Sequence, residues 1–187
     1  MMEKEITRIL SILKPDGLKG AMLETPRRME STLRYLTAGY IRTPEKVLKV
    51  FEEPSCDEMV FQGNIAVYSL CEHHILPFFG VAHVAYIPDK KIVGLSKIAR
   101  VIEILSRRFQ VQERLTAEIA DTLYNHLNAR GAGVVLRCRH MCMEMRGIKK
   151  PGTITYTSAL RGCVKISGDA REEFMSFVQM ADAKTSI

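Results

Sequence analysis

The chain has 187 residues, of which 47% are hydrophobic and 26% charged, enough for one buried core and short for two domains. No apolar run reaches the roughly 18 residues of a membrane helix, and the opening Met-Met-Glu-Lys-Glu lacks the pattern of a secretory signal. The net charge of +6 suits any polyanion, from nucleic acid to a nucleoside triphosphate. We therefore expect a single-domain cytoplasmic protein with no membrane partner.

Two helices are predicted near the start of the chain. Residues 3–14 place apolar side chains at helical spacing, and Pro15-Asp16-Gly17 ends that pattern. Thr25 then has the character of an N-cap, Pro26 stands at a first helical position, and the helix is expected to reach about Gly39.

The next part of the chain predicts a pair of strands. Residues 42–56 have only weak patterning and predict a connection. Met59–Leu70 and Gly80–Ile87 are rich in Val, Ile, Phe and Tyr, which is typical of strands. They flank the segment Cys71–Pro77, so we expect chemically active residues at a strand end.

Two amphipathic helices follow. Leu95–Phe109 and Arg114–Ala129 both repeat apolar residues at helical spacing, and they are joined near Gln110–Glu113. Gly131-Ala-Gly133 is expected to end the second helix.

The C-terminal part predicts strands over Val134–Met143 and Thr153–Leu160 and a final helix over Glu172–Met180. The order of strand pair, helix pair and strand pair indicates an α+β fold.

Cysteines and histidines gather in two short segments. Five cysteines, an odd number, argue against a disulfide framework and favour metal ligation or free thiols. Cys71 and His74 have the spacing of many zinc half-sites, in which a tight turn brings a thiolate and an imidazole to one ion. Cys138, His140 and Cys142 would point to one face of the predicted strand and could add a third ligand. We predict a metal site from these two segments.

The number of ligands stays open on these residues alone. The two cysteines of the later segment would lie about 13 Å apart on a straight strand, so only one can reach a given ion. Three protein ligands with an open position describe a hydrolytic zinc site, whereas four describe a structural one. Either His73 or His140 could supply the fourth ligand. His83 and His126 are interpreted as packing residues.

A phosphate site is predicted where the first long helix begins. Ser96, Lys97 and Arg100 share one face of its first turn. Free backbone N–H groups and two cations suit a phosphate there, although a basic helix start is more often only a solvated face. Arg146 and Arg28 could add further cations.

Glu113, preceded by Gln112, stands at the junction of the two long helices. A carboxylate can accept hydrogen bonds from both N1–H and N2–H of guanine, a pairing that adenine does not offer. The plainer interpretation is a favourable acidic residue in a first helical turn.

Five motifs carry a close resemblance to the GTP cyclohydrolase I family. They are Leu70-Cys-Glu-His-His74, Gly94-Leu-Ser-Lys-Ile-Ala-Arg100, Gln110-Val-Gln-Glu-Arg-Leu-Thr116, His140-Met-Cys-Met143 and Arg146-Gly147. The similarity runs from about Thr25 to Phe174. It implies hydrolytic opening of the guanine ring of GTP, release of formate and rearrangement to 7,8-dihydroneopterin triphosphate, the first step of folate and pterin biosynthesis.

The resemblance also implies an assembly. Its tunnelling fold closes antiparallel sheets of several subunits into a barrel, within a homodecamer of two stacked pentamers whose active sites lie at subunit interfaces. Residues 1–24 would form an N-terminal helical segment and residues 25–187 a single catalytic domain. The expected partners are GTP and further copies of the chain, with no nucleic acid.

The metal ligands implied by the resemblance are Cys71, His74 and Cys142, which would hold Zn2+ and leave one position for water. Cys138 is then unassigned. The matching family position is commonly not a cysteine, so this thiol is expected to be either a packing residue or an oxidation liability near the metal.

Other roles are implied in the same way. His140 would supply a proton to N7 of guanine, His73 would assist proton transfers near the ribose, and Ser96 would help the sugar rearrange. Arg28 would reach the triphosphate from a neighbouring subunit. The residues implied to hold the triphosphate or the base are Lys97, Arg100, Arg146, Arg28, Gln112 and Glu113.

Two rival functions fit parts of the sequence. A zinc-stapled module for nucleic acid would use the charge of +6 and a closed four-ligand site. A related tunnelling-fold enzyme would act on a different purine or pterin. The combined presence of the three metal ligands and the triphosphate cations favours the GTP enzyme over both.

Overall fold

The computed structural model describes residues 2–53 and 55–183 of the chain. The helices are α1 (Met2–Leu13), α2 (Thr25–Leu36), α3 (Leu95–Ser106), α4 (Gln112–Leu127), α5 (Met141–Glu144), α6 (Cys163–Ile166) and α7 (Gly168–Asp182). The strands are β1 (Val50–Glu52), β2 (Val60–Cys71), β3 (Pro77–Ile87), β4 (Lys91–Val93), β5 (Phe109–Gln110), β6 (Gly131–His140) and β7 (Ile154–Gly162). Short 3-10 helices cover Gly20–Glu24, Ala38–Ile41 and Pro44–Val47. The α+β prediction is confirmed.

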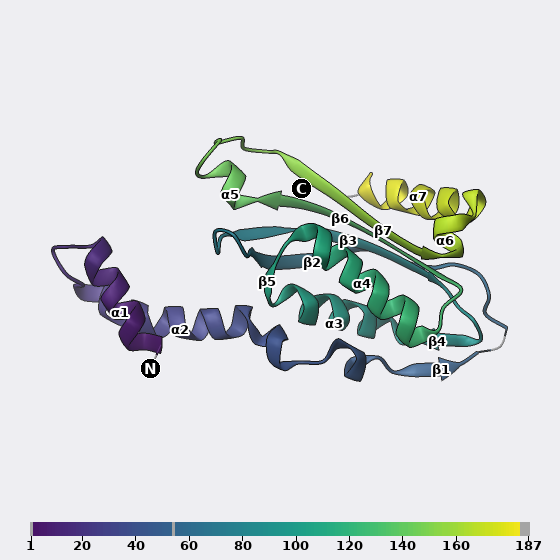
Figure 1. The fold of residues 1–187 in the computed structure, drawn as a ribbon, viewed down its shortest axis with the longest axis horizontal. Coiled ribbons are helices and arrows are strands. Elements are labelled where there is room, and N and C mark those ends of the chain that lie inside the picture. Colours follow the sequence, from purple (N-terminus) through teal and green to yellow (C-terminus); the bar gives the residue numbers. More distant parts are fainter. Residues whose placement is uncertain (1, 54, 184–187) are drawn as a thin grey trace.

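A five-stranded sheet in the order β5-β2-β3-β6-β7 forms the centre of the molecule (Figure 1). All its pairs are antiparallel except β2 with the two-residue β5. The register pairs Leu70 with Pro77 and Phe78 with His140. The end of β2, the start of β3 and the end of β6 therefore meet at one end of the sheet, which we call the metal end.

The two faces of the sheet are covered differently. Residues of β3 and β6 alternate between the faces, as the pleat requires. One face packs against α3 and α4 in the larger core cluster, which includes Phe78, Ile98 and Leu123. The other face packs against α6 and α7 in a smaller cluster, which includes Val135 and Phe174. Because side chains alternate along β6, His140 lies on the same face of the sheet as the residues that pack against α4.

Helices α1 and α2 form an arm that extends from the sheet (Figure 1). They pack against one another, and Ile6 is buried. Other large apolar side chains of this part of the chain stay exposed, among them Ile12 and Leu13 at 70% and 75%. An apolar surface of this kind usually marks a contact with another molecule.

Two predicted boundaries are wrong for identifiable reasons. Helix α4 ends at Leu127, followed by Asn128 in the left-handed conformation with φ 49°, so Gly131-Ala-Gly133 lies in β6 and does not end the helix. A Cβ on Gly133 would lie 3.0 Å from the Phe174 ring, so this glycine allows α7 to pack closely on the sheet. The strand predicted to reach Met143 stops at His140, where α5 begins.

Smaller differences occur elsewhere. Thr25 is the first residue of α2 and its N-cap is Glu24, whose side chain makes no capping bond. Helix α3 stops at Ser106, and β5 begins at Phe109, where the predicted helix was expected to end. The predicted connection over residues 42–56 contains β1, which pairs with β4, while residue 54 lies outside the described part of the chain.

Candidate metal-centred active site

The turn between β2 and β3 brings Cys71 and His74 together. The N–H of Ile75 donates to the Cys71 carbonyl at 2.8 Å, and the N–H of Cys71 donates to the Leu76 carbonyl at 2.9 Å. Ile75 adopts φ 54°, which is strained for a β-branched residue. Strain of this kind is found preferentially at functional sites.

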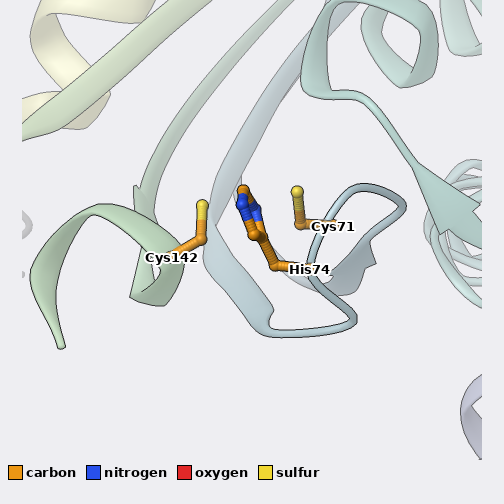
Figure 2. A group of neighbouring side chains, drawn as sticks. All are labelled: Cys71, His74 and Cys142. Carbon is orange, nitrogen blue, oxygen red and sulfur yellow. The ribbon is translucent and has the colours of Figure 1, made fainter. Parts of the chain in front are cut away.

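Cys142 reaches the same point from α5. One ligand atom from each of Cys71, His74 and Cys142 lies within 4.8 Å of the other two, and Figure 2 shows the three side chains converging. Because the chain turns into a helix after His140, Cys142 leaves the strand direction that the sequence suggested. Cys138 stays on β6, 1% exposed in the larger core cluster, and takes no part in the group.

The three side chains fit a metal ion of the zinc type. Two sulfurs of a tetrahedral zinc site lie about 3.8 Å apart, given Zn–S bonds of about 2.3 Å, so small side-chain movements would complete the geometry. Burial, and then the neighbouring Cys71 thiol, raises the pKa of the Cys142 thiol above its ordinary value, because two adjacent thiolates would repel without a cation. Among the described residues no fourth Cys, His, Asp or Glu joins the group.

A cavity of about 200 Å³ opens beside the three ligands. The chain positions that line it come from the β2–β3 turn, the α3–α4 junction and the end of β6. They are Cys71, His73, His74, Gln110, Val111, Gln112, Glu113, His140 and Cys142. Seven of the residues selected from the sequence therefore surround one cavity.

His140 is held on two sides. Its ring stacks on Phe78, with centroids 4.9 Å apart and planes 9° apart, and its Nε2 lies 2.7 Å from Gln112 Oε1. Burial lowers the pKa of His140 below its ordinary value, and the Glu113 carboxylate partly offsets this effect. His73 is exposed, with Nδ1 3.8 Å from Cys71 Sγ.

Gln112 and Glu113 begin α4 but differ in surroundings. The Gln112 side chain is buried, with 2% of the residue exposed, and its amide is bonded within the chain. Glu113 is exposed at the cavity. Contact of either residue with a base stays a prediction.

The expected phosphate residues are divided among three places. Arg146 lies at the metal end, with Nη1 3.3 Å from His74 Nε2. Ser96, Lys97 and Arg100 lie in the first turns of α3, whose last residue is Ser106, near the metal end. At 1.5 Å per residue, Lys97 is about 14 Å along the helix from that residue.

Arg100 and Arg28 line cavities of their own. Arg100, Arg42 and Lys46 surround a cavity of about 520 Å³. Arg28 lines another of about 410 Å³ together with Leu70. One chain alone thus does not bring Ser96, Lys97, Arg100 or Arg28 into the cavity beside the metal ligands.

Sequence reasoning missed the residues that hold the metal-binding turn. Glu72 forms an ion pair with Arg114, whose Nε donates to Gln110 Oε1 at 3.0 Å. The N–H of Glu72 also donates to the Gln110 carbonyl at 3.0 Å. Gln110 ends β5 and Arg114 lies in the first turn of α4, four residues later, and that spacing was the available signal.

The fold and the open three-ligand group describe an α+β protein with a candidate metal-dependent active site. The family model of GTP cyclohydrolase I matches residues 2–179. The GTP cyclohydrolase 1 of Campylobacter lari is 47% identical over 180 residues, covering 96% of this chain and 95% of the relative. That of Chlorobaculum tepidum is 53% identical over 175 residues, covering 91% and 78%. That of Wolinella succinogenes is 46% identical over 179 residues, covering 95% and 96%.

A match over nearly the whole chain, with relatives of this identity and coverage, leaves one assignment. The chain belongs to the GTP cyclohydrolase I family and is an enzyme of that family.

Proposed function

We propose that this protein hydrolyses the guanine ring of GTP, releases C8 as formate and rearranges the remainder to 7,8-dihydroneopterin triphosphate. The single observation that carries the proposal is the cavity that joins the Cys71, His74 and Cys142 group to His140 and Glu113. Opening the ring and releasing formate consume two waters and closing the pterin ring returns one. The net reaction therefore uses one water.

The proposed metal is zinc, held by Cys71, His74 and Cys142. Two thiolates and one imidazole are ligands that zinc favours, and an open fourth position is typical of catalytic sites. Zinc bound there would supply Lewis acidity and lower the pKa of a water molecule to about 7. The Arg146 guanidinium beside His74 adds positive charge where an anionic substrate would approach.

The proton transfers are assigned to the two histidines of the cavity. His140, held against Phe78, would deliver a proton to N7 as the imidazole ring opens. His73, exposed beside Cys71, would act nearer to the ribose. Ser96 would assist the rearrangement of the sugar.

Substrate binding is assigned to the residues implied by the family. Glu113 would accept hydrogen bonds from N1–H and N2–H of guanine, since its carboxylate is exposed at the cavity. The main chain of Gln112 would complete the base end of the site. The triphosphate would be held by Lys97, Arg100, Arg146 and Arg28.

These assignments require more than one chain, and we propose a homodecamer whose active sites lie between subunits. Lys97 and Arg100 begin α3, away from the metal end of their own chain. The exposed apolar side chains of α1 and α2 offer a surface for association. The proposal also keeps residues 1–24 as a helical segment, residues 25–187 as the catalytic domain, and sheets of several subunits joined in a barrel.

A cytoplasmic location and a role at the start of folate and pterin biosynthesis complete the proposal. All five cysteines are free thiols, which suits a reducing compartment. No helix in the described part of the chain is long and apolar enough to cross a membrane.

The test is to incubate the zinc-loaded protein with GTP while following formate and the ultraviolet absorbance of a dihydropterin. Both products are expected to appear, and both to vanish after EDTA treatment. Formate without pterin would mean that the reaction stops after ring opening. No product with zinc bound would refute the proposal and favour another purine substrate.

A further inference from the structure

The amide of Gln112 has a single possible orientation. One end of it faces the carbonyls of Leu136 at 3.2 Å and Thr155 at 3.0 Å. Carbonyl oxygens only accept hydrogen bonds, so the amide group facing them must be the NH2 donor, Nε2. The oxygen, Oε1, is thereby turned towards His140.

The hydroxyl of Thr157 agrees with this orientation. Thr116 Oγ1 donates its proton to the Gln112 carbonyl at 2.7 Å, so it can only accept from Thr157 Oγ1 at 2.6 Å. The one proton of Thr157 is therefore used, and its oxygen accepts from Gln112 Nε2 at 3.0 Å. Three acceptors surround Nε2 and none is a donor towards it.

The tautomer of neutral His140 follows from the same contacts. Gln112 Oε1 can only accept, so the proton of the 2.7 Å contact belongs to His140 Nε2. The other nitrogen, Nδ1, then carries a lone pair and has no hydrogen-bond partner among residues 2–53 and 55–183. Stacking on Phe78 fixes the ring plane as well.

From these contacts we infer that Gln112 acts through His140 and not by binding guanine with its side chain. It is a positioning residue that keeps one proton on Nε2, so that Nδ1 first accepts a proton from the water that adds to C8 and then gives that proton to N7 of guanine. This inference rests on the proposed function, in which His140 serves N7 of guanine. Both N–H protons of the Gln112 amide are used within the chain, its oxygen faces His140 Nε2, and only 2% of the residue is exposed, so guanine would have to displace these internal bonds to reach the side chain.

The test compares Gln112→Met, His140→Ala and the double variant with GTP and with ITP, which lacks the guanine N2 amino group. Gln112→Met is expected to lower kcat about 100-fold, with KM and the preference for GTP over ITP unchanged. In the His140→Ala background it should cause no further loss, because two residues of one unit are not additive. A raised KM, an altered preference for GTP over ITP, or the same 100-fold loss without His140 would overturn the inference.

Gln62→Met is the matched control. It makes the same chemical change in β2, eight residues and so about 26 Å of strand before Leu70. Turnover should be unaffected in this variant. Metal content, thermal unfolding and oligomeric state are measured for all the variants. These measurements distinguish loss of His140 positioning from loss of the folded structure.

A measurement on the unaltered holoenzyme covers the case in which Gln112→Met does not fold. With histidine labelled by 15N, the imidazole signals of His140 are identified by their disappearance in His140→Ala. Neutral His140 protonated at Nε2 is expected, and the Nδ1-protonated tautomer would contradict the inference. If the wild type releases no formate from GTP, the proposed function fails. The tautomer of His140 still tests whether Gln112 positions its imidazole.

Discussion

The metal end and the amino end of α3 differ in how one chain completes them. At the metal end, a turn, a helix start and a strand end place the three ligands, His140 and Glu113 around a single cavity. At the other end, Lys97 and Arg100 lie in the first turns of α3, and Arg100 lines a separate cavity with Arg42 and Lys46. One chain therefore brings together the candidate metal ligands and the proposed base-binding residue, whereas under our proposal a second chain completes the triphosphate site.

The largest expected effect comes from the metal end. Cys142→Ala should lose the metal and lower kcat by about 1,000-fold or more, because a two-ligand site cannot hold the ion. Metal content by atomic emission and formate release measure the two effects. Cys138→Ala is the control and should retain both, since this thiol lies in the core and outside the ligand group. Metal loss in the control and its retention in Cys142→Ala would reverse the assignment.

Mixing two inactive variants tests whether the metal ligands and the triphosphate cations of one active site come from different chains. Cys142→Ala and the double variant Lys97→Ala/Arg100→Ala are each expected to be nearly inactive. If subunits exchange at random and each site takes its halves from two chains, about a quarter of the sites become intact. Recovery of formate release in the mixture, and not in either variant alone, is the expected result. Proven subunit exchange without recovery would place both halves in one chain.

Glu113→Ala tests whether Glu113 binds the guanine base. Loss of two charge-assisted hydrogen bonds, each contributing about 1.5–3 kcal/mol, should raise KM for GTP by about 100-fold or more. Metal content should not change, because Glu113 is not among the ligands. Steady-state kinetics with GTP measures this, and Glu173→Ala, an exposed glutamate on α7, is the control. An unchanged KM would remove Glu113 from the guanine site.

The smallest effect concerns the thiol that the metal end does not use. Burial raises the pKa of Cys138 to about 12. The thiolate fraction at pH 8 is then about 1 in 10,000, and it grows only as the pH approaches 12. Iodoacetamide should therefore leave Cys138 unmodified at pH 8 in folded, EDTA-treated protein, as read by peptide mass spectrometry. Ready modification in the folded state would mean that β6 opens at the metal end.

The extent of β6 explains a limit of prediction from sequence. The alternation of residues around Cys138 and His140 continues to Met143 and predicts a strand to that point. Phe78 pairs with His140 and β3 begins one residue earlier, at Pro77, while β7 begins opposite Arg139. Opposite Met141 stands Pro77, which has no N–H to donate, and neither β3 nor β7 continues further, so the chain turns into α5. Pairing partners of this kind are set by residues distant in sequence.

The sequence by itself determined the α+β class, most of the elements, the residue types of the metal group and the family. Local periodicity and spacing carry that information, because they depend on neighbouring residues. Only the tertiary structure decided that Cys142 lies on a helical turn, that Cys138 packs in the core, and that the Gln112 amide is engaged by His140 and backbone carbonyls. Each of these depends on which strand ends and helix starts meet, and that is set by packing of the sheet against α3 and α4.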